Sequence, residues 1–179
     1  MAFAYIAAYN DTTEGTKVVW DKNLLSPTVI PGARRRQDAA WLARLRAEGI
    51  ERLVASAPAP PREFYQGLEE FNLGQYWQAH ETLEEVWQHT EYPLRLFYHG
   101  LIKLAVGFLH LERHNLTGAR IQLQRAISYL GPFQPSFIGI RLDDVTLEAE
   151  RRLKDAAQGE GWDSLDGLPR PRIQWALSE

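Results

Sequence analysis

Residues 93–113 read PLRLFYHGLIKLAVGFLHLER and are apolar at most positions. An α-helix that is hydrophobic on nearly every side belongs in the interior of a protein. Pro93 is tolerated at the first position of a helix, because the N–H that it lacks would have no helical partner there. The stretch therefore predicts a buried central helix from Pro93 to about Arg113, against which the other elements pack.

Four further helical segments surround this one in the sequence. The first spans about Pro61–Leu73, with Phe64 and Leu68 on one face. Gly74 is a natural end for it, since glycine tolerates the left-handed backbone that closes many helices. The others are a helix that carries residues 76–87, one that follows a break at 115–118 and ends near Leu130, and one at 143–157. Together they predict a bundle of about five helices over residues 62–158.

Residues 1–57 have a different pattern and predict a small α+β module. Short β-prone runs alternate with turn residues, and a basic helix with spaced apolar residues follows. The expected elements are strands at 3–9 and 16–20 that form a hairpin, an irregular connection marked by Pro27 and Pro31, a helix at 34–48 and a third strand at 50–55. The Pro-rich residues 58–61 are expected to be a linker, and residues 159–179 an extended tail. The predicted fold class is mainly α, a helical bundle preceded by a small α+β module.

The composition excludes several classes of function. The 179 residues include no cysteine, which excludes disulfides, a thiol nucleophile and zinc held by cysteine. The formal net charge of −3 argues against a strongly basic nucleic-acid binder, although Arg34–Arg36, Arg44 and Arg46 offer contacts to phosphates. No apolar run reaches the roughly 20 residues that span a bilayer, and the first residues lack the basic start of a secretory signal. We expect a cytoplasmic protein without a membrane or nucleic-acid partner.

The segment His80–Trp87, HETLEEVW, carries the best candidate site. His80 and Glu84 are four residues apart and share one face of the expected helix. The next helix carries a polar stripe on an otherwise apolar surface, formed by His99, Lys103, His110 and His114. Because the connection between the two helices is short, they are expected to be antiparallel neighbours.

Antiparallel packing would bring acidic and basic side chains together in the interior. A buried lysine or histidine without a partner is costly, and a carboxylate is its natural partner. We therefore expect a partly enclosed pocket between the two helices. Its polar walls would be His80, Glu84, Lys103 and His110, with Trp77 or Trp87 as an aromatic wall.

Three functions fit such a cluster. As a binding site, it would recognise a small polar or anionic ligand or partner. As an enzyme of hydrolase type, it would use Glu84 or His80 as the general base and Lys103 as an electrostatic stabiliser. As a structural element, its polar groups would satisfy one another and fix the register of the helices. The residues alone leave these alternatives open.

A divalent metal is a further and weaker alternative for the same cluster. His80, Glu84 and His110 are side chains that zinc, manganese or iron accept as ligands. The His-Glu-x-x-His spacing of zinc proteases is absent, as are the Glu-x-x-His pairs of di-iron bundles. Lys103 beside the site would repel a cation. The sequence therefore requires no cofactor.

Two parts of the bundle resemble each other. Phe64–Leu68 reads FYQGL and Phe97–Leu101 reads FYHGL, and Gly74 and Gly107 keep the same offset of 33 residues. Such a period is typical of duplicated helical hairpins. We interpret the two segments as related hairpins in one compact bundle. The chain has six tryptophans, many for one small core, and some are expected to cover a homodimer interface.

Several of these motifs occur together in one prokaryotic family. The segments that carry the likeness are FNLGQYWQAHETLEEVW at Phe71–Trp87, FYHGLIKLA at Phe97–Ala105, His110, and NLTGAR at residues 115–120. They resemble the domain of unknown function 309 family over about residues 62–131. The resemblance implies a small bundle that is entirely helical. Residues 1–60 lie outside it.

The resemblance also implies which side chains belong to the family's signature. These are His80, Glu81, Glu84, Trp87 and His110. Many relatives have glutamine where this chain has Lys103, so the chain departs from the family pattern there. The candidate ligand-binding residues are the five signature residues together with Lys103. The family has no established activity, so the resemblance implies a fold and a site but no reaction.

Overall fold

The computed structural model describes residues 16–19, 28–31, 33–54, 57–157 and 169–176. The chain divides into two compact units, Met1–Ala47 and Glu48–Glu179. Most of the described residues are helical, so the prediction of a mainly α protein is confirmed.

In the first unit, two strands form an antiparallel hairpin. They are β1 (Thr16–Val19) and β2 (Thr28–Pro31). The strand predicted at 16–20 is therefore confirmed. The irregular connection predicted up to Pro31 is wrong, because the three residues before this proline are β-branched and favour a strand. The other predicted strand, at residues 3–9, lies outside the described residues.

The helix predicted after the hairpin is confirmed, and the strand predicted after that helix is wrong. The helix α2 is Ala33–Glu48. Residues 50–55 were expected to be a strand, but Ile50–Leu53 form a single helical turn, α3. Gly49 separates the two helices with a φ of 80°. The N–H of Val54 donates to the first carbonyl of the turn at 2.8 Å, so a local hydrogen bond closes this turn without any neighbouring strand.

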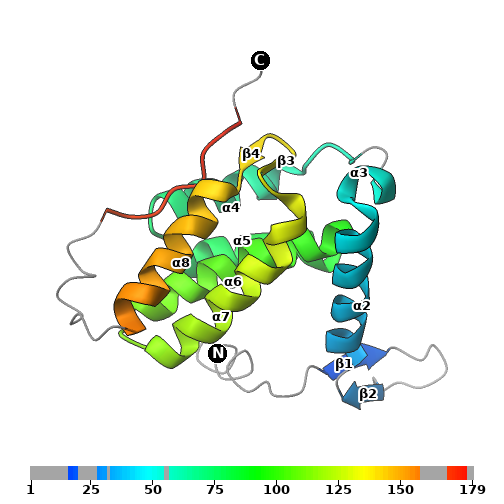
Figure 1. Cartoon of the computed structure of the whole chain (residues 1–179), viewed down its shortest axis with the longest axis horizontal. Coiled ribbons are helices and arrows are strands. Elements are labelled where there is room, and N and C mark those ends of the chain that lie inside the picture. The colour runs from blue at the N-terminus through cyan, green and yellow to red at the C-terminus, as the bar shows by residue number, and fades with distance from the viewer. Residues whose placement is uncertain (1–15, 20–27, 32, 55–56, 158–168, 177–179) are drawn as a thin grey trace. The chain divides into compact units, whose positions relative to one another are not determined.

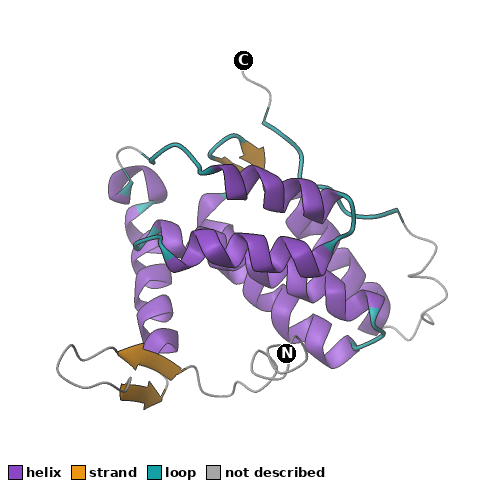
Figure 2. Ribbon diagram, turned by 180° about the vertical axis from the view of Figure 1, so that it is seen from behind, coloured by secondary structure: helices purple, strands orange, loops and turns teal. Residues whose placement is uncertain are grey.

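The second unit is a bundle in which each helix packs against the next one in the chain. Its helices are α4 (Arg62–Asn72), α5 (Tyr76–Gln88), α6 (Leu94–Glu112), α7 (Leu116–Leu130) and α8 (Asp143–Ala157). Figure 1 and Figure 2 show them from opposite sides. All five predicted helices are confirmed. The predicted break at 115–118 is too long, because Asn115 caps a helix that begins at the next residue.

The central position predicted for α6 is confirmed. Every residue from Leu96 to Leu111 is buried, and both α5 and α7 pack against this helix. Within the described residues, α6 is the one helix that is long and apolar enough to cross a bilayer, but 89% of the stretch in question is buried inside the protein. Such burial is that of the core helix of a bundle.

The repeated sequence motif corresponds to a repeated packing arrangement. A Cβ on either Gly67 or Gly100 would lie 2.7 Å from a leucine side chain of another helix, so both glycines let helices approach closely. The phenylalanines that open the two motifs are both fully buried, with ring centroids 6.2 Å apart. The second pair of glycines does not correspond, since Gly74 lies in a turn with a φ of 78° and Gly107 lies within α6.

A second hairpin, absent from the sequence predictions, follows α7. A 3₁₀ turn, η1 (Gly131–Phe133), leads into β3 (Ser136–Phe137), which pairs with β4 (Ile140–Arg141). Trp175 of the C-terminal segment forms a β-bridge with Ile140. The segment 169–176 therefore adds a short length of chain to the edge of this hairpin.

The same C-terminal segment also forms hydrogen bonds with the end of α4. The Asn72 side chain accepts from the Ile173 N–H at 2.7 Å and donates to the Ile173 carbonyl at 3.0 Å. Ile173 is buried. Trp175 is 51% exposed and stacks on Tyr65, with ring centroids 5.8 Å apart.

Candidate functional site

Helix α5 places His80 and Glu84 on one face, one turn apart. His80 is 3% exposed, and its Nε2 atom lies 3.7 Å from Oε2 of Glu84, which is 12% exposed. Ala79, Leu83 and Val86 of the same helix are buried in the core. Their packing fixes the rotation of α5 and directs His80 into the interior.

Lys103 on α6 acts on His80 from the neighbouring helix. Lys103 is 5% exposed. Burial lowers the pKa of His80 to about 4, and the positive charge of Lys103 contributes to this shift, while a hydrogen bond with the Trp77 backbone opposes it. His80 is therefore neutral at pH 7. The α5–α6 cluster, as we call His80, Glu84 and Lys103, combines a neutral imidazole, a carboxyl group and an amine.

The aromatic neighbour of the α5–α6 cluster is Trp77. Its ring centroid lies 5.2 Å from that of His80, and its side chain is partly exposed. Glu81, the next residue after His80, is exposed. The cluster therefore lies at an edge of the α5–α6 packing, with Trp77 on one side.

Trp87 lies seven residues from His80, which is about 10 Å along the axis of α5. It is buried, with the Arg95 guanidinium 4.0 Å from its ring centroid and the His99 ring 5.1 Å away. Arg95 also donates to the carbonyls of Trp87 and Thr90, at 2.7 and 3.0 Å. Trp87 thus packs the C-terminal end of α5. The sequence reasoning missed Arg95, although a basic residue just beyond a helix C-terminus is a recognised signal for this role.

His110 is separated from Lys103 by seven residues of α6, again about 10 Å along the axis. It is 4% exposed, and its Nδ1 atom lies 3.2 Å from Nδ2 of Asn115. Oδ1 of Asn115 accepts from the Gly118 N–H at 2.9 Å, so the amide NH₂ of Asn115 faces His110. An NH₂ group can only donate, and Nδ1 must therefore accept. The neutral ring then carries its proton on Nε2.

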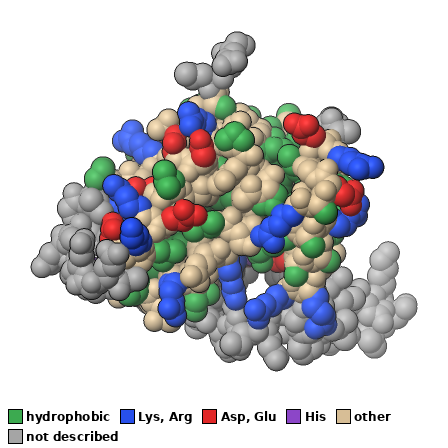
Figure 3. All heavy atoms as spheres, viewed as in Figure 1, with side chains coloured by type: hydrophobic (Ala, Val, Ile, Leu, Met, Phe, Trp, Pro, Cys, Tyr) green, Lys and Arg blue, Asp and Glu red, His purple; other side chains and the backbone are tan. Residues whose placement is uncertain are grey.

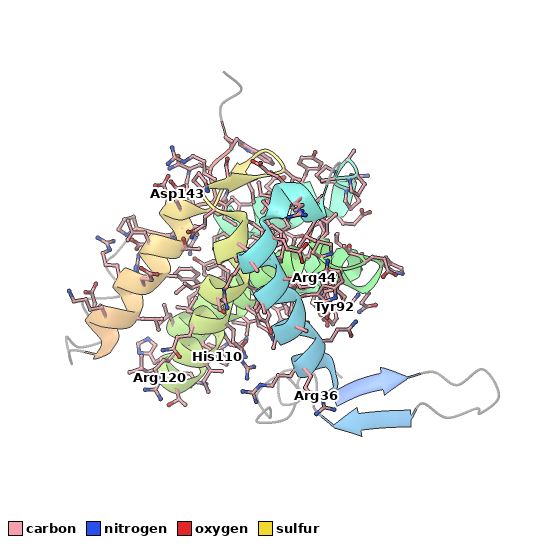
Figure 4. All side chains as sticks on the ribbon, turned by 45° about the vertical axis from the view of Figure 1, so that its right-hand side comes forward. Arg36, Arg44, Tyr92, His110, Arg120 and Asp143 are labelled. Atoms are coloured by element: carbon pink, nitrogen blue, oxygen red, sulfur yellow. The ribbon has the colours of Figure 1, made fainter. Side chains whose placement is uncertain are left out.

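Gly118 makes room for the His110 ring. A Cβ on Gly118 would lie 2.7 Å from Nδ1 of His110. Burial lowers the pKa of His110, and the positive charge of Arg113 lowers it further. His110, Asn115 and Gly118 form what we call the α6–α7 junction; Figure 4 labels His110. Two of the family motifs, at His110 and at 115–120, therefore meet in one structural unit.

The metal hypothesis needs His80, Glu84 and His110 to converge. Within the described residues, no group of three or more histidine, aspartate or glutamate side chains is placed to hold a metal ion. His80 and Glu84 lie together, whereas His110 contacts Asn115 at the α6–α7 junction. The cation of Lys103 acts on His80.

Residues 57–122 match the model of a family described as a domain of unknown function, DUF309. Over these residues the chain is similar to that family. The match extends from before α4 into α7, so the matched region includes both the α5–α6 cluster and the α6–α7 junction. The resemblance predicted from the sequence motifs is confirmed. A comparison with curated proteins finds no match to the chain.

Proposed function

We propose that the protein binds a small polar or anionic ligand at the α5–α6 cluster. The observation that carries this proposal is the buried amine of Lys103, acting on a neutral imidazole that lies beside the Glu84 carboxyl group. An ammonium group donates hydrogen bonds, while a carboxylate and a neutral imidazole nitrogen accept them. A ligand with a carboxylate or phosphate oxygen for Lys103 and a hydroxyl or amino group for Glu84 complements this set.

The energetic cost of the cluster supports a role in recognition. Removing an ammonium group from water costs several kcal/mol, and attraction to a partner often only offsets that cost. An apolar side chain of similar volume on α6 would fill the same space without it. Lys103 is therefore a weak stabiliser of the fold, and its burial favours a function beyond packing.

The exposure of the neighbouring side chains supports access by a small molecule. Glu84 is 12% exposed, Trp77 is partly exposed and Glu81 is fully at the surface. A ligand that approaches from this edge meets a carboxyl group and an aromatic ring before it reaches Lys103. The Trp77 ring offers an apolar wall against which part of the ligand can pack.

Titration of the ¹⁵N-labelled full chain with small carboxylates, phosphates and amino acids tests the proposal by NMR. We expect at least one compound to shift the amide signals of His80, Glu84 and Lys103. Lys103→Met should weaken its binding by about tenfold or more, since a charge-assisted hydrogen bond is lost. His89→Ala, an exposed histidine just after α5, is the matched control and should bind normally. No shift with any compound, or equal binding by Lys103→Met, would contradict the proposal.

General base catalysis by the same cluster is the second candidate function. A neutral His80 with a carboxyl oxygen 3.7 Å from Nε2 resembles a base and the group that orients it. A pKa of about 4 makes His80 a weak base at pH 7, because a general base works best when its pKa is near the working pH. Hydrolase activity therefore ranks below binding. Ester or phosphoester hydrolysis that is lost in His80→Gln would favour the enzyme.

A further inference from the structure

The basic helix α2 has an exposed face of unusual composition. Every exposed residue from Arg35 to Ala47 is either arginine or alanine. These residues are Arg35, Arg36, Ala39, Ala40, Ala43, Arg44, Arg46 and Ala47. Asp38, the acidic residue within this span, is buried. The exposed charged residues from 35 to 47 are therefore all arginines, and the exposed Glu48 follows them.

Helix geometry spreads the arginines over about half of the helix circumference. At 100° per residue, Arg35 and Arg46 are three turns apart on one side of the face, about 16 Å along the axis. Arg44 lies on the opposite side of the face, and Arg36 and the alanines lie between the two sides. Figure 4 labels Arg36 near the start of α2 and Arg44 further along. The Arg44 guanidinium lies 4.6 Å from the Trp41 ring centroid, a contact that restricts its motion.

The start of α2 also departs from the usual electrostatics of helices. The N-terminus of a helix is electropositive, so cations there are unfavourable and acidic residues are preferred. Arg34, Arg35 and Arg36 occupy the first turn of α2, which has no acidic residue. Sequences that break such a local rule commonly do so at a functional site. Here the arginines and the helix dipole together attract anions.

We infer that α2 binds the phosphate backbone of nucleic acid through Arg35, Arg36, Arg44 and Arg46. Guanidinium groups on both sides of the face complement the two lines of phosphates that border a groove, and the alanines between the two sides let the helix approach closely. The major groove of B-form DNA is about 12 Å wide and admits an α-helix. Figure 3 shows Lys and Arg side chains around α2, where green apolar side chains lie between them.

The charge of the whole chain does not oppose this inference. The net charge of −3 is an average over 179 residues, whereas α2 alone carries five arginines against two acidic residues. At physiological salt, charges more than about 8 Å away are largely screened. The local charge of α2 therefore decides what it attracts, and the expectation from bulk composition does not apply to this face.

An anionic membrane is a poorer partner for the same face. Helices that lie on membranes insert large apolar side chains such as leucine, phenylalanine and tryptophan between the lipids. The exposed apolar residues between the arginines of α2 are alanines, which add little buried area. Phosphates presented along a rigid backbone fit this surface better than a lipid headgroup layer does.

Fluorescence anisotropy with the full chain tests the inference. The probes are a labelled DNA duplex of about 20 base pairs and a single-stranded RNA of the same length, titrated over about 50 to 200 mM salt. We expect at least one probe to bind, with an affinity that falls as salt rises. The double variant Arg35→Ala/Arg46→Ala should bind about tenfold or more weakly, and its slope of log K against log salt should be smaller by about 2, one for each lost phosphate contact.

A matched control removes two exposed arginines from the second unit, Arg120→Ala/Arg151→Ala, and should retain both affinity and salt slope. The variant Arg35→Glu/Arg36→Glu places acidic residues at a helix N-terminus, so it should keep its helix content by circular dichroism and yet lose binding. Equal loss in the control would overturn the inference. So would the absence of binding at the lowest salt, or tighter binding to vesicles of anionic lipid than to either nucleic acid.

Discussion

Two buried histidines of the second unit, His80 and His110, occupy contrasting environments. They are 3% and 4% exposed, and burial lowers the pKa of both. His80 lies beside Glu84, and the charge of Lys103 on the neighbouring helix lowers its pKa. His110 meets the neutral amide of Asn115, which also caps α7. A neutral local partner serves the fold, whereas charged groups gathered from two helices cost stability and favour a functional role.

Truncation of each histidine tests this contrast with the largest expected effect. His110→Ala should lower the free energy of unfolding by about 4 kcal/mol, since it leaves a cavity at a helix junction and removes the partner of Asn115. His80→Ala should cost less than half as much, because water can enter the space left beside the partly exposed Glu84. Urea denaturation at pH 7 measures both, with His89→Ala as the surface control. Equal losses would make the α5–α6 cluster as structural as the α6–α7 junction.

The pH dependence of stability should report His80. Its pKa is about 4 in the folded protein and 6.5 in the unfolded chain, so between these values the unfolded state binds a proton that the folded state does not. Stability is therefore unaffected by this group above pH 6.5 and falls as the pH drops toward 4, by about 3 kcal/mol in total. His80→Gln should flatten that part of the urea-derived profile. If the variant and the unmodified protein gave the same profile, burial would not lower the pKa of His80.

Substitutions of Asn115 can separate its two contacts, the cap of α7 and the hydrogen bond to His110. Asn115→Ala removes both the cap of α7 and the donor to His110, and should cost about 2 kcal/mol. Asn115→Asp keeps an oxygen for the Gly118 N–H but presents a carboxylate to Nδ1, so it should raise the pKa of His110. NMR titration of the imidazole nitrogens measures this pKa, and it also tests for the Nε2-protonated ring in the unmodified protein. A pKa unchanged in Asn115→Asp would contradict the assigned contact.

The sequence predicts an element of the fold well where the residues that specify it lie within that element or next to it. The apolar run on α6 and the glycine after α4 predicted their helices because each signal lies within or next to its own element. The turn at Ile50–Leu53 was mistaken for a strand, since four residues with a β-branched member do not distinguish the two. The hairpin of β3 and β4 was missed because each of its strands has two residues, too few for a pattern of alternation.

The candidate site was predictable to the same degree. The effect of the Lys103 charge on His80 follows from a short connection and antiparallel packing, which the spacing on α5 and α6 indicates. The stripe on α6 suggested that His110 would join them. A stripe shows that its side chains share one face of the helix, but it does not show that they are close together. Seven residues of helix separate His110 from Lys103. The carbonyl contacts of Arg95 depend on how the chain turns between the helices, which the pattern of residues does not give.

The smallest expected effect concerns Lys103 itself. Lys103→Met replaces a buried amine by an apolar chain of similar length, so it should leave stability unchanged or raise it by about 1 kcal/mol. Removing the positive charge should also raise the pKa of His80, although burial keeps it under 6.5. Lys154→Met on the exposed side of α8 is the control and should change neither quantity. If Lys103→Met instead costs several kcal/mol, Lys103 holds the two helices together, and the contrast between His80 and His110 disappears.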